Sequence, residues 1–181
     1  MEKPLWRRRA SVYVVDSKYL RLRKDDIELP DGTVIADYYV RESAGFVVIF
    51  ALTADRQVVL VRQYRYGADS IGLELPAGSL EPGEDPLACA HRELAEETGY
   101  AAPSLRLIGR YRAEPVHSDA YAYVYLAENA RLESNQRLDP TEQIEVELVA
   151  LGSLQILLRQ GAIDTGASIA AAYLGLEAIS S

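Results

Sequence analysis

Residues 78–100, which read GSLEPGEDPLACAHRELAEETGY, bring Arg92 close in sequence to four glutamates of interest, Glu84, Glu93, Glu96 and Glu97. Glu93 and Glu97 are four residues apart, so on a helix they project from one stripe. Like charges at that spacing repel each other and destabilise an isolated helix. A bound divalent cation, which prefers hard oxygen ligands, would offset this repulsion. The commoner origin of such a pair is a solvated acidic helix face, and that is the alternative interpretation.

The elements that position these carboxylates are predicted to be a loop and then a helix. Asp85 suits the N-cap, and Pro86 suits the first helical position, where its missing N–H costs nothing. Gly99 suits the left-handed position just after the helix end. At about 100° per residue, one face of the helix is mostly apolar and should pack on the core. That face comprises Leu87, Ala90, His91, Leu94 and Thr98.

The order of these residues, G-x5-E-x7-R-E-L-x-E-E-x-G-Y, resembles the Nudix box, G-x5-E-x7-R-E-U-x-E-E-x-G-U, where U is a bulky apolar residue. Tyr100 departs mildly, because the last position is more usually Ile, Leu or Val. The resemblance implies an enzyme that uses a divalent metal to cleave a nucleoside diphosphate linked to another moiety. The positions that match are Gly78, Glu84, Arg92, Glu93, Leu94, Glu96, Glu97 and Gly99.

The resemblance also implies which groups bind the metal. Glu93 and Glu97 are the expected main ligands, and Glu96, counted also among the catalytic residues, binds directly or through water. Ala77 is expected to offer its backbone carbonyl. The expected ion is Mg2+, with Mn2+ as the alternative. Such ions suit phosphoryl chemistry because they neutralise diphosphate charge and help deprotonate water.

Two further catalytic roles follow from the resemblance. Arg92 is expected to orient the glutamates by ion pairing, while Glu84 braces the loop through Arg92. The general base in the related enzymes comes from a mobile loop before the last strand, here about residues 133–143. Glu142 is the first candidate and Asp139 the second, although a loop carboxylate is commonly just solvated.

The flanks of the box resemble the ADP-ribose pyrophosphatase branch of the family. The shared features include Val61–Arg65 (VRQYR), Glu74–Gly78 (ELPAG) and Pro115, fifteen residues past the box. Where that branch often has Ser-Pro-Gly, this chain has Glu-Pro-Val. The branch implies Mg2+-dependent hydrolysis of ADP-ribose to AMP and ribose 5-phosphate. The alternatives are hydrolysis of ADP-glucose or GDP-mannose, and a catalytically silent module that senses a nucleotide.

Four residues are expected to contact the substrate. Arg65 precedes a glycine-containing loop, where a guanidinium could fork onto a phosphate. Arg62 lies on the same strand, and an ordinary surface location is its equal alternative. Pro115 marks the loop expected at the ribose-phosphate end. Tyr39, or its neighbour Tyr38, is expected to stack on the base, with simple packing as the alternative.

Composition narrows the class of protein. The chain has 181 residues, of which 49% are hydrophobic, enough for a sizeable core. Its net charge of −8 argues against a general nucleic-acid-binding surface. Its one cysteine, Cys89, cannot form an internal disulfide. With neither a signal peptide nor an apolar membrane segment evident, a cytoplasmic protein without membrane contact is expected.

The N-terminal region, residues 1–43, is predicted to be a small antiparallel β meander that follows a flexible basic arm at residues 1–10. A sheet this small is marginal alone, so it should pack on the main domain or on another subunit. The related enzymes commonly exchange this meander between subunits, which implies a homodimer. The predicted strands are Ser11–Val15, Tyr19–Lys24, Ile27–Pro30 and Thr33–Arg41.

The remainder, residues 44–181, mixes strands with helices and is predicted to be α+β. With the box recognised, the expected architecture is the Nudix fold, a mixed β-sheet sandwiched between helices. The apolar run Gly45–Leu52 should be a strand buried on both faces. The other predicted strands are Gln57–Tyr66, Leu105–Ala113, Ser118–Leu126 and Ile144–Leu151. Besides the box helix, the predicted helices are Ser153–Gln160 and about Ala167–Glu177.

Overall fold

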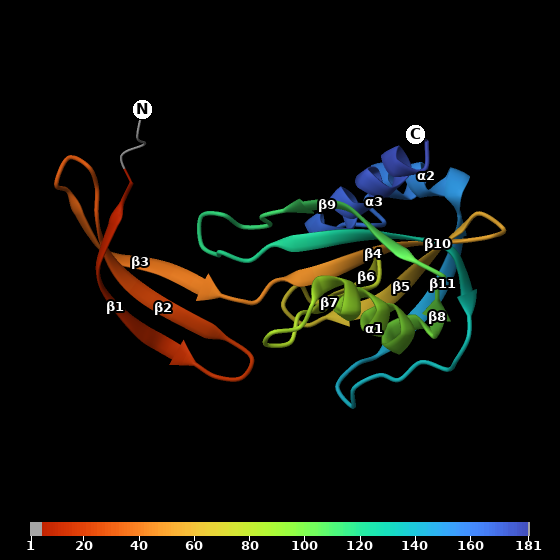
Figure 1. The fold of residues 1–181 in the computed structure, drawn as a ribbon, viewed down its shortest axis with the longest axis horizontal. Coiled ribbons are helices and arrows are strands. Elements are labelled where there is room, and N and C mark those ends of the chain that lie inside the picture. The colour runs from red at the N-terminus through yellow and green to blue at the C-terminus, as the bar shows by residue number, and fades with distance from the viewer. Residues whose placement is uncertain (1–4, 181) are drawn as a thin grey trace. The chain divides into compact units, whose positions relative to one another are not determined.

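The computed structural model describes residues 5–180 and divides into two compact units (Figure 1). The first unit contains the chain up to Ala44 together with Arg112–Ala120, and the second contains Gly45–Tyr111 together with the chain from Tyr121 onward. The loop at 112–120 therefore belongs structurally with the N-terminal region, although it lies far along the sequence.

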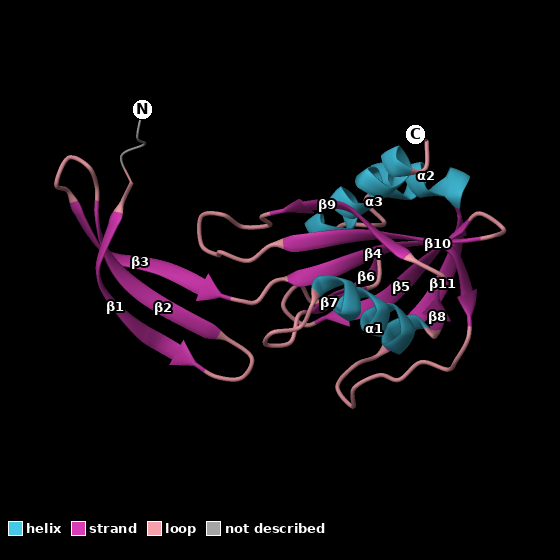
Figure 2. Ribbon diagram, in the orientation of Figure 1, coloured by secondary structure: helices cyan, strands magenta, loops and turns pink. Residues whose placement is uncertain are grey.

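The first unit is built on a three-stranded antiparallel sheet, in the order β1-β2-β3 (Figure 2). The meander is therefore confirmed, but two details of the prediction are wrong. Its first strand already begins at Arg7, because Arg7 and Arg9 pair with Glu28 across the sheet at 2.7 and 3.3 Å. The two short strands predicted between residues 19 and 30 form a single strand. The bounds are β1 Arg7–Asp16, β2 Arg21–Glu28 and β3 Val34–Glu42.

The loop at 112–120 is fixed to β3. The Arg41 N–H donates to the His117 carbonyl at 2.7 Å, and the Tyr38 hydroxyl donates to the Val116 carbonyl. The His117 Nδ1 atom lies 3.0 Å from the Tyr39 carbonyl oxygen. Strand β3 thus holds this loop through both backbone and side-chain contacts. Of the predicted basic arm, residues 1–4 lie outside the described residues.

The second unit is built on an eight-stranded mixed sheet with a main path β11-β5-β4-β10-β8. Strands β6, β7 and β9 pair with β5, β4 and β10 respectively. Strands β4 and β10 run parallel, and the other pairs are antiparallel. The bounds are β4 Phe46–Thr53, β5 Gln57–Arg65, β6 Ser70–Glu74, β7 Ala77–Ser79, β8 Tyr100–Ala101, β9 Leu105–Tyr111, β10 Ala122–Leu132 and β11 Ile144–Ala150.

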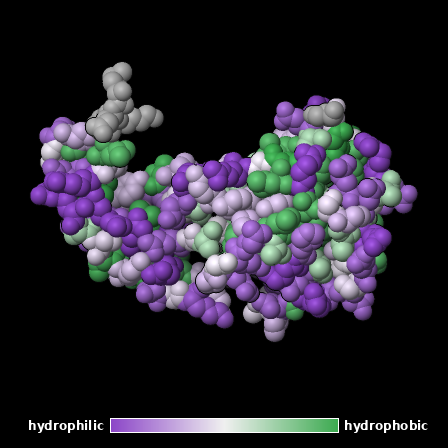
Figure 3. Space-filling view, in the orientation of Figure 1, coloured by the Kyte–Doolittle hydropathy of each residue, from purple (hydrophilic) through white to green (hydrophobic). Residues whose placement is uncertain are grey.

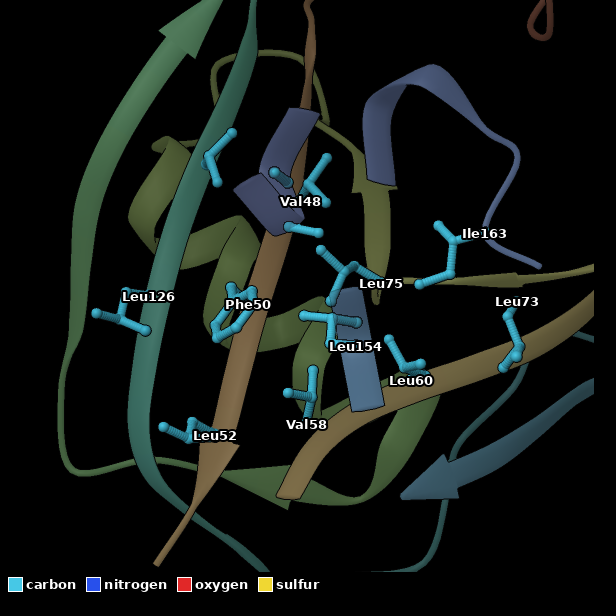
Figure 4. Packing of buried hydrophobic residues seen from close by; sticks show 13 residues of the cluster. Val48, Phe50, Leu52, Val58, Leu60, Leu73, Leu75, Leu126, Leu154 and Ile163 are labelled. Carbon is cyan, nitrogen blue, oxygen red and sulfur yellow. The ribbon is translucent and has the colours of Figure 1, made fainter. Parts of the chain in front are cut away.

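Helices cover both faces of this sheet: α1 (Pro86–Thr98) covers one, and α2 (Leu151–Gln160) and α3 (Gly166–Ala178) cover the other (Figures 1 and 2). Phe50 packs with Leu154 and Ala171 on the α2–α3 side, and Figure 4 shows Phe50 among its neighbours from the sheet. Ile49 packs with Leu94 on the α1 side. Alternate residues of β4 thus enter two cores, which confirms both the predicted sandwich and the burial of β4 on both faces.

Several boundaries in the second unit differ from the predicted ones. The sequence did not predict β6, β7 or β8, because two to five residues are too few to show a hydrophobic period. Strand β10 begins four residues later than predicted. It also continues past the predicted end at Leu126 to Leu132, because the polar residues after Ala127 interrupt the apolar pattern but not the strand. Within the described part of the chain, the helices are all too short or too polar to cross a membrane.

Candidate active site

The helix α1 begins and ends as its cap residues predict. The Asp85 Oδ1 atom accepts hydrogen bonds from the Leu87 and Ala88 N–H groups at 2.9 and 3.2 Å, and Pro86 occupies the first turn. Gly99 ends the helix with a φ of 73°, and its N–H donates to the Ala95 carbonyl at 2.9 Å. These capping contacts fix the two ends of α1 and therefore place Glu93, Glu96 and Glu97 within the helix.

The buried face of α1 is not quite the predicted one. Ala90, Leu94 and Thr98 are buried as expected, but Leu87 and His91 are exposed. Cys89 and Glu97 are buried in their place. The helix is therefore rotated so that a carboxylate, and not an apolar residue, enters the interior. A charged group costs free energy there unless it is paired, so Glu97 needs a compensating interaction.

Arg92 binds three of the glutamates. Its Nε and Nη2 atoms each lie 2.9 Å from an oxygen of Glu84, which is a bidentate contact. Its Nη1 atom lies 2.7 Å from Glu93 Oε1 and 3.1 Å from Glu96 Oε2. Glu84 Oε2 also accepts from the Glu81 N–H at 2.9 Å. The Arg92 guanidinium, helped by that N–H, lowers the pKa of Glu84 from 4.5 to about 2.

Glu93 lies directly against the backbone of the strand before the helix. A Cβ at Gly78 would stand 1.9 Å from the Glu93 Cδ atom and 2.0 and 2.3 Å from its two oxygens. Gly78 lies in β7, whose pairing with β4 at Val47 holds it in place. The glycine is thus required for close approach and not for an unusual backbone angle. Burial raises the pKa of Glu93, against the opposing effect of Arg92.

Glu97 is the deepest carboxylate of the cluster, with 5% of its surface exposed. Its Oε2 atom accepts a hydrogen bond from the Ala77 N–H at 2.9 Å. Burial, with the negative charges of Glu93 and Glu142, raises the pKa of Glu97 to about 8. The Ala77 N–H and Arg65 act in the opposite direction. Below about pH 8, the protein without metal therefore favours the protonated form of the Glu97 carboxyl.

The residues fit a hard divalent cation by their chemistry. Among residues 5–180, no three Asp, Glu, His or Cys side chains already form a ready-made metal cluster. The oxygens of Glu93 and Glu97 are nevertheless held against β7 by a glycine contact and a backbone N–H. Their pKa values are raised, and a nearby cation would favour the charged forms. Carboxylate oxygens are the ligands that Mg2+ and Mn2+ prefer.

Arg65 and Arg62 project from opposite faces of β5. Residues alternate along a strand, so Arg65 shares the face of Val59, which packs with α1, whereas Arg62 shares that of Leu60, which packs with α2 and α3. Arg62 Nη2 pairs with Glu147 at 2.6 Å on the neighbouring strand β11. The structure therefore brings Arg65, and not Arg62, toward the face that carries the glutamates.

Arg65 makes a bidentate contact with Glu74. Its Nε and Nη2 atoms lie 2.9 and 2.8 Å from the two Glu74 oxygens, and Glu74 is 5% exposed. The Glu74 carboxylate raises the pKa of Arg65, with smaller contributions from Glu97 and Glu142. The guanidinium is held in one orientation with Nη1 outside this pair, while nearly half of the Arg65 side chain is exposed.

Glu142 lies in the loop between β10 and β11. The Glu142 N–H donates to the Asp139 carbonyl at 2.9 Å, and the Asp139 N–H donates to Glu142 Oε2 at 3.0 Å. The Glu142 charge contributes to the raised pKa of both Glu93 and Glu97, so its carboxylate is within electrostatic range of the cluster.

Tyr39, on β3, and Pro115, in the loop at 112–120, both belong to the first unit. The Glu114 carbonyl accepts from the His117 and Ser118 N–H groups at 3.2 and 2.9 Å, which makes a turn around Pro115. The Tyr39 side chain is 42% exposed. Its neighbour Tyr38 lies with its ring centroid 5.8 Å from that of His117.

Two residues of the site have no role in the sequence interpretation, Glu74 and Gln136. Glu74 stands between Leu73 and Leu75, both buried. A carboxylate between two core residues in a strand is a signal for a paired buried charge. Gln136 donates from Nε2 to the Glu97 carbonyl at 2.6 Å and to the Ile144 carbonyl at 3.1 Å. No local pattern marks Gln136, because both partners are distant in the sequence.

The sequence of this chain matches two protein-family models. Residues 43–171 match the model of the NUDIX domain, and residues 6–40 match that of the nucleoside diphosphate sugar hydrolase N-terminal domain. An ADP-ribose pyrophosphatase of Bacillus subtilis (strain 168) is 34% identical over 170 residues, covering 93% of this chain and 91% of that protein.

Two other similarities cover nearly the whole chain. A methanol dehydrogenase activator of Bacillus methanolicus is 33% identical over 166 residues, covering 91% of this chain and 89% of that protein. A crystal structure of an ADP compounds hydrolase superposes with a TM-score of 0.84, covering 99% of this chain and 96% of that one. With 23% sequence identity, that superposition concerns the fold alone.

Proposed function

This chain belongs to the NUDIX domain family, and we propose that it hydrolyses the diphosphate of a nucleoside diphosphate sugar, with ADP-ribose as the first substrate. The products would be AMP and ribose 5-phosphate. Family membership confirms the resemblance found in the sequence. The observation that carries the proposal is the convergence of Glu84, Glu93 and Glu96 around Arg92, beside a glycine that admits the Glu93 carboxylate. The similarity to an ADP-ribose pyrophosphatase over most of the chain supports the substrate.

Glu93, Glu96, Glu97 and the Ala77 carbonyl are proposed to hold the cation, Mg2+ in the first instance and Mn2+ as the alternative. When bound, the ion would neutralise diphosphate charge and lower the pKa of a water molecule. The proposal is supported by the contact of Glu97 with the Ala77 N–H, which brings both residues to one point. Arg92 is proposed to hold Glu93 and Glu96 in register through the ion pairs already formed with their carboxylates.

Glu142 is the proposed general base and Asp139 the second candidate. Glu142 would take the proton of the attacking water, a role that requires a carboxylate beside the cluster. Its effect on the pKa values of Glu93 and Glu97 supports this assignment. In the conformation described, Glu142 Oε2 accepts from the Asp139 N–H, and the second carboxylate oxygen is the one proposed to take the proton of the water molecule.

Arg65 is proposed to bind a substrate phosphate, because Glu74 fixes its guanidinium while Nη1 lies outside that pair. Arg62 is the weaker candidate for phosphate binding, because its guanidinium pairs with Glu147 on the α2–α3 side of the sheet. Pro115 and Tyr39 are proposed to act at the sugar and base ends of the substrate. The exposure of Tyr39 supports a ring free to stack.

A homodimer is the proposed assembly, with residues 1–43 as the dimerising part and 44–181 as the hydrolase domain. All ten residues of β1 are exposed, among them Val12 and Val14 at 54% and 46%. Figure 3 shows hydrophobic residues among hydrophilic ones on the visible face of the N-terminal sheet. An exposed edge strand with apolar side chains is suited to pairing with a second chain.

The proposed location is the cytoplasm. The single cysteine, Cys89, cannot form an internal disulfide, which is compatible with a reducing compartment.

A hydrolysis panel tests the proposed function. Purified protein with Mg2+ would be offered ADP-ribose, ADP-glucose, GDP-mannose, NADH, diadenosine polyphosphates and dGTP, with products identified by chromatography. The highest kcat/KM is expected for ADP-ribose, with AMP and ribose 5-phosphate in equal amounts. Preference for another nucleotide sugar would support the proposed metal-dependent hydrolysis but contradict ADP-ribose as the substrate. Nucleotide binding without turnover of any compound would indicate a silent sensor.

A further inference from the structure

The loop between β10 and β11, residues 133–143, is attached to the C-terminal end of α1. The Glu133 and Ser134 N–H groups donate to the Gly99 carbonyl at 2.9 and 3.1 Å, and the Arg137 N–H donates to the Glu96 carbonyl at 2.9 Å. Carbonyls in the last turn of a helix have no intrahelical partner, so this loop satisfies groups that would otherwise need water. The start of the loop is therefore tied to the helix that carries the glutamates.

Within residues 133–143, the Gln136 side chain links the loop to both α1 and β11. Its Nε2 atom lies 2.6 Å from the Glu97 carbonyl oxygen and 3.1 Å from the Ile144 carbonyl oxygen. Both partners are acceptors, so the NH2 group, which has two hydrogens, must be the end that faces them. One side chain thus joins the backbone of Glu97 to the first residue of β11.

Glu142 lies between these two attachments. It follows Gln136 by six residues and precedes Ile144 by two, and its own turn is closed by the two hydrogen bonds with Asp139. The segment from Arg137 to Gln143 is therefore a short arch whose two ends meet at the Gln136 amide. If that amide is removed, Arg137 keeps its backbone bond to α1 and Ile144 keeps its pairing with Gln63, but the direct link between the two ends of the arch is lost and residues between them can shift.

We propose that Gln136 is a positioning residue, which fixes Glu142 at the distance from Glu93 and Glu97 that the reaction requires. The inference rests on the proposed role of Glu142. The Gln136 amide acts through the backbone carbonyls of Glu97 and Ile144, and not through the Glu97 carboxylate. Its substitution should therefore alter the chemical step and leave substrate binding and metal binding nearly unchanged.

The variant Gln136→Leu keeps most of the side-chain volume and removes both hydrogen bonds. A displacement of about 1 Å can cost roughly a hundredfold in rate, so kcat for ADP-ribose should fall by about tenfold to a hundredfold. The KM and the Mg2+ concentration for half-maximal rate should stay near their wild-type values. Glu133→Gln is the matched control, because the Glu133 side chain lies in the same loop but pairs with Arg131 on β10. It should keep the wild-type kcat.

A double-mutant cycle separates positioning from general structural damage. In a Glu142→Gln background, Gln136→Leu should lower kcat little further, because the group that Gln136 positions has already lost its function. An equal fold-loss in both backgrounds would overturn the proposal, as would an unchanged kcat in the single variant. If Glu142→Gln itself is fully active, the assigned base is wrong, and that failure is visible before the Gln136 result is considered.

Hydrogen exchange on the metal-free protein gives a readout that does not depend on activity. Amides of residues 133–143 should exchange faster in Gln136→Leu than in Glu133→Gln, while β4 and β5 exchange as in the wild type. Unchanged exchange in this loop would show that the Gln136 amide does not hold it and would overturn the proposal. Faster exchange throughout the second unit would also overturn it, because the role would then be general stability.

Discussion

Replacement of Gly78 by alanine should disable the site without unfolding the protein. The added Cβ would stand 1.9 Å from the Glu93 Cδ atom, a separation that cannot persist, so the carboxylate must move by about 1 Å or more. The carboxylate is the far end of a flexible side chain, so the strand and helix can stay in place. A displacement of this size for a metal ligand predicts a loss of about a hundredfold in kcat.

The stability of the Gly78→Ala variant should change little. Moving Glu93 weakens its 2.7 Å hydrogen bond to Arg92 Nη1, and because the guanidinium keeps Glu84 and Glu96 as partners we expect this partial loss to cost about 1 kcal/mol. Alanine has fewer backbone conformations than glycine in the unfolded chain, and this difference stabilises the folded state by about 0.4–1 kcal/mol. The free energy of unfolding should therefore change by less than about 1 kcal/mol, or less than about 4 °C in Tm for a chain of this length.

Gly175→Ala is the matched control, because it also adds a methyl group against a side chain. Its Cβ would stand 2.2 Å from the Phe50 Cδ2 atom, but this ring is wholly buried and cannot swing away. Overpacking of this kind costs about 1–3 kcal/mol. Gly175→Ala should therefore lower Tm by several degrees, about 2–4 °C per kcal/mol, and keep the wild-type kcat in its folded fraction.

The assays are urea unfolding for stability and steady-state hydrolysis of ADP-ribose for kcat. A thermal shift on adding Mg2+ supplies a third readout, because a ligand that binds only the folded state raises Tm. That shift should be smaller in Gly78→Ala than in the wild type. A Gly78→Ala variant with wild-type kcat and an undiminished Mg2+ shift would refute the assignment of Glu93. A loss of stability as large as that of Gly175→Ala would refute the argument that only the Glu93 side chain moves.

Three further predictions address single carboxylates. Glu97→Gln should lower kcat by about a thousandfold and weaken Mg2+ binding in calorimetry, because metal-assisted charge stabilisation is worth several kcal/mol, at about 1.4 per tenfold; near-wild-type activity would reject the ligand assignment. Glu142→Gln should lower kcat by about 10²–10⁴-fold with KM unchanged, as for a lost general base; an unchanged rate would pass the role to Asp139, to be checked by the same steady-state kinetics on Asp139→Asn. The pKa of Glu84 is lowered from 4.5 to about 2, so its stabilising contribution is complete above pH 4.5 and is lost as pH falls toward 2. Urea unfolding should therefore show the wild type losing more stability than Glu84→Gln between pH 5 and pH 3, and equal losses would contradict the ion pair with Arg92.

The parts of the fold that depend on local chemistry could be predicted from the sequence. The helix α1 begins after Asp85 and ends at Gly99, because capping requires only residues adjacent to the helix. The strand β4 could be predicted because its apolar run is continuous, which requires burial on both faces. In each case the pattern and its cause lie within one segment.

The parts that depend on distant partners could not be predicted. Glu97 is buried although the predicted apolar face of the helix did not include it, since the tertiary position of α1 beside Ala77 decides its burial. The side of β5 from which Arg62 projects depends on which core each alternate residue enters. Gln136 gives no sequence signal at all, because its partners, the carbonyls of Glu97 and Ile144, are backbone groups that every residue has.

The most direct measurement is the release of AMP and ribose 5-phosphate from ADP-ribose as Mg2+ is added back to chelator-treated protein, with Glu97→Gln assayed beside the wild type. Both products should appear in equal amounts in the wild type only after Mg2+ is added, and they should nearly vanish in the variant at every concentration. Equal product formation with and without Mg2+, or in the wild type and Glu97→Gln, would contradict the claim that these glutamates form a metal-dependent hydrolytic site.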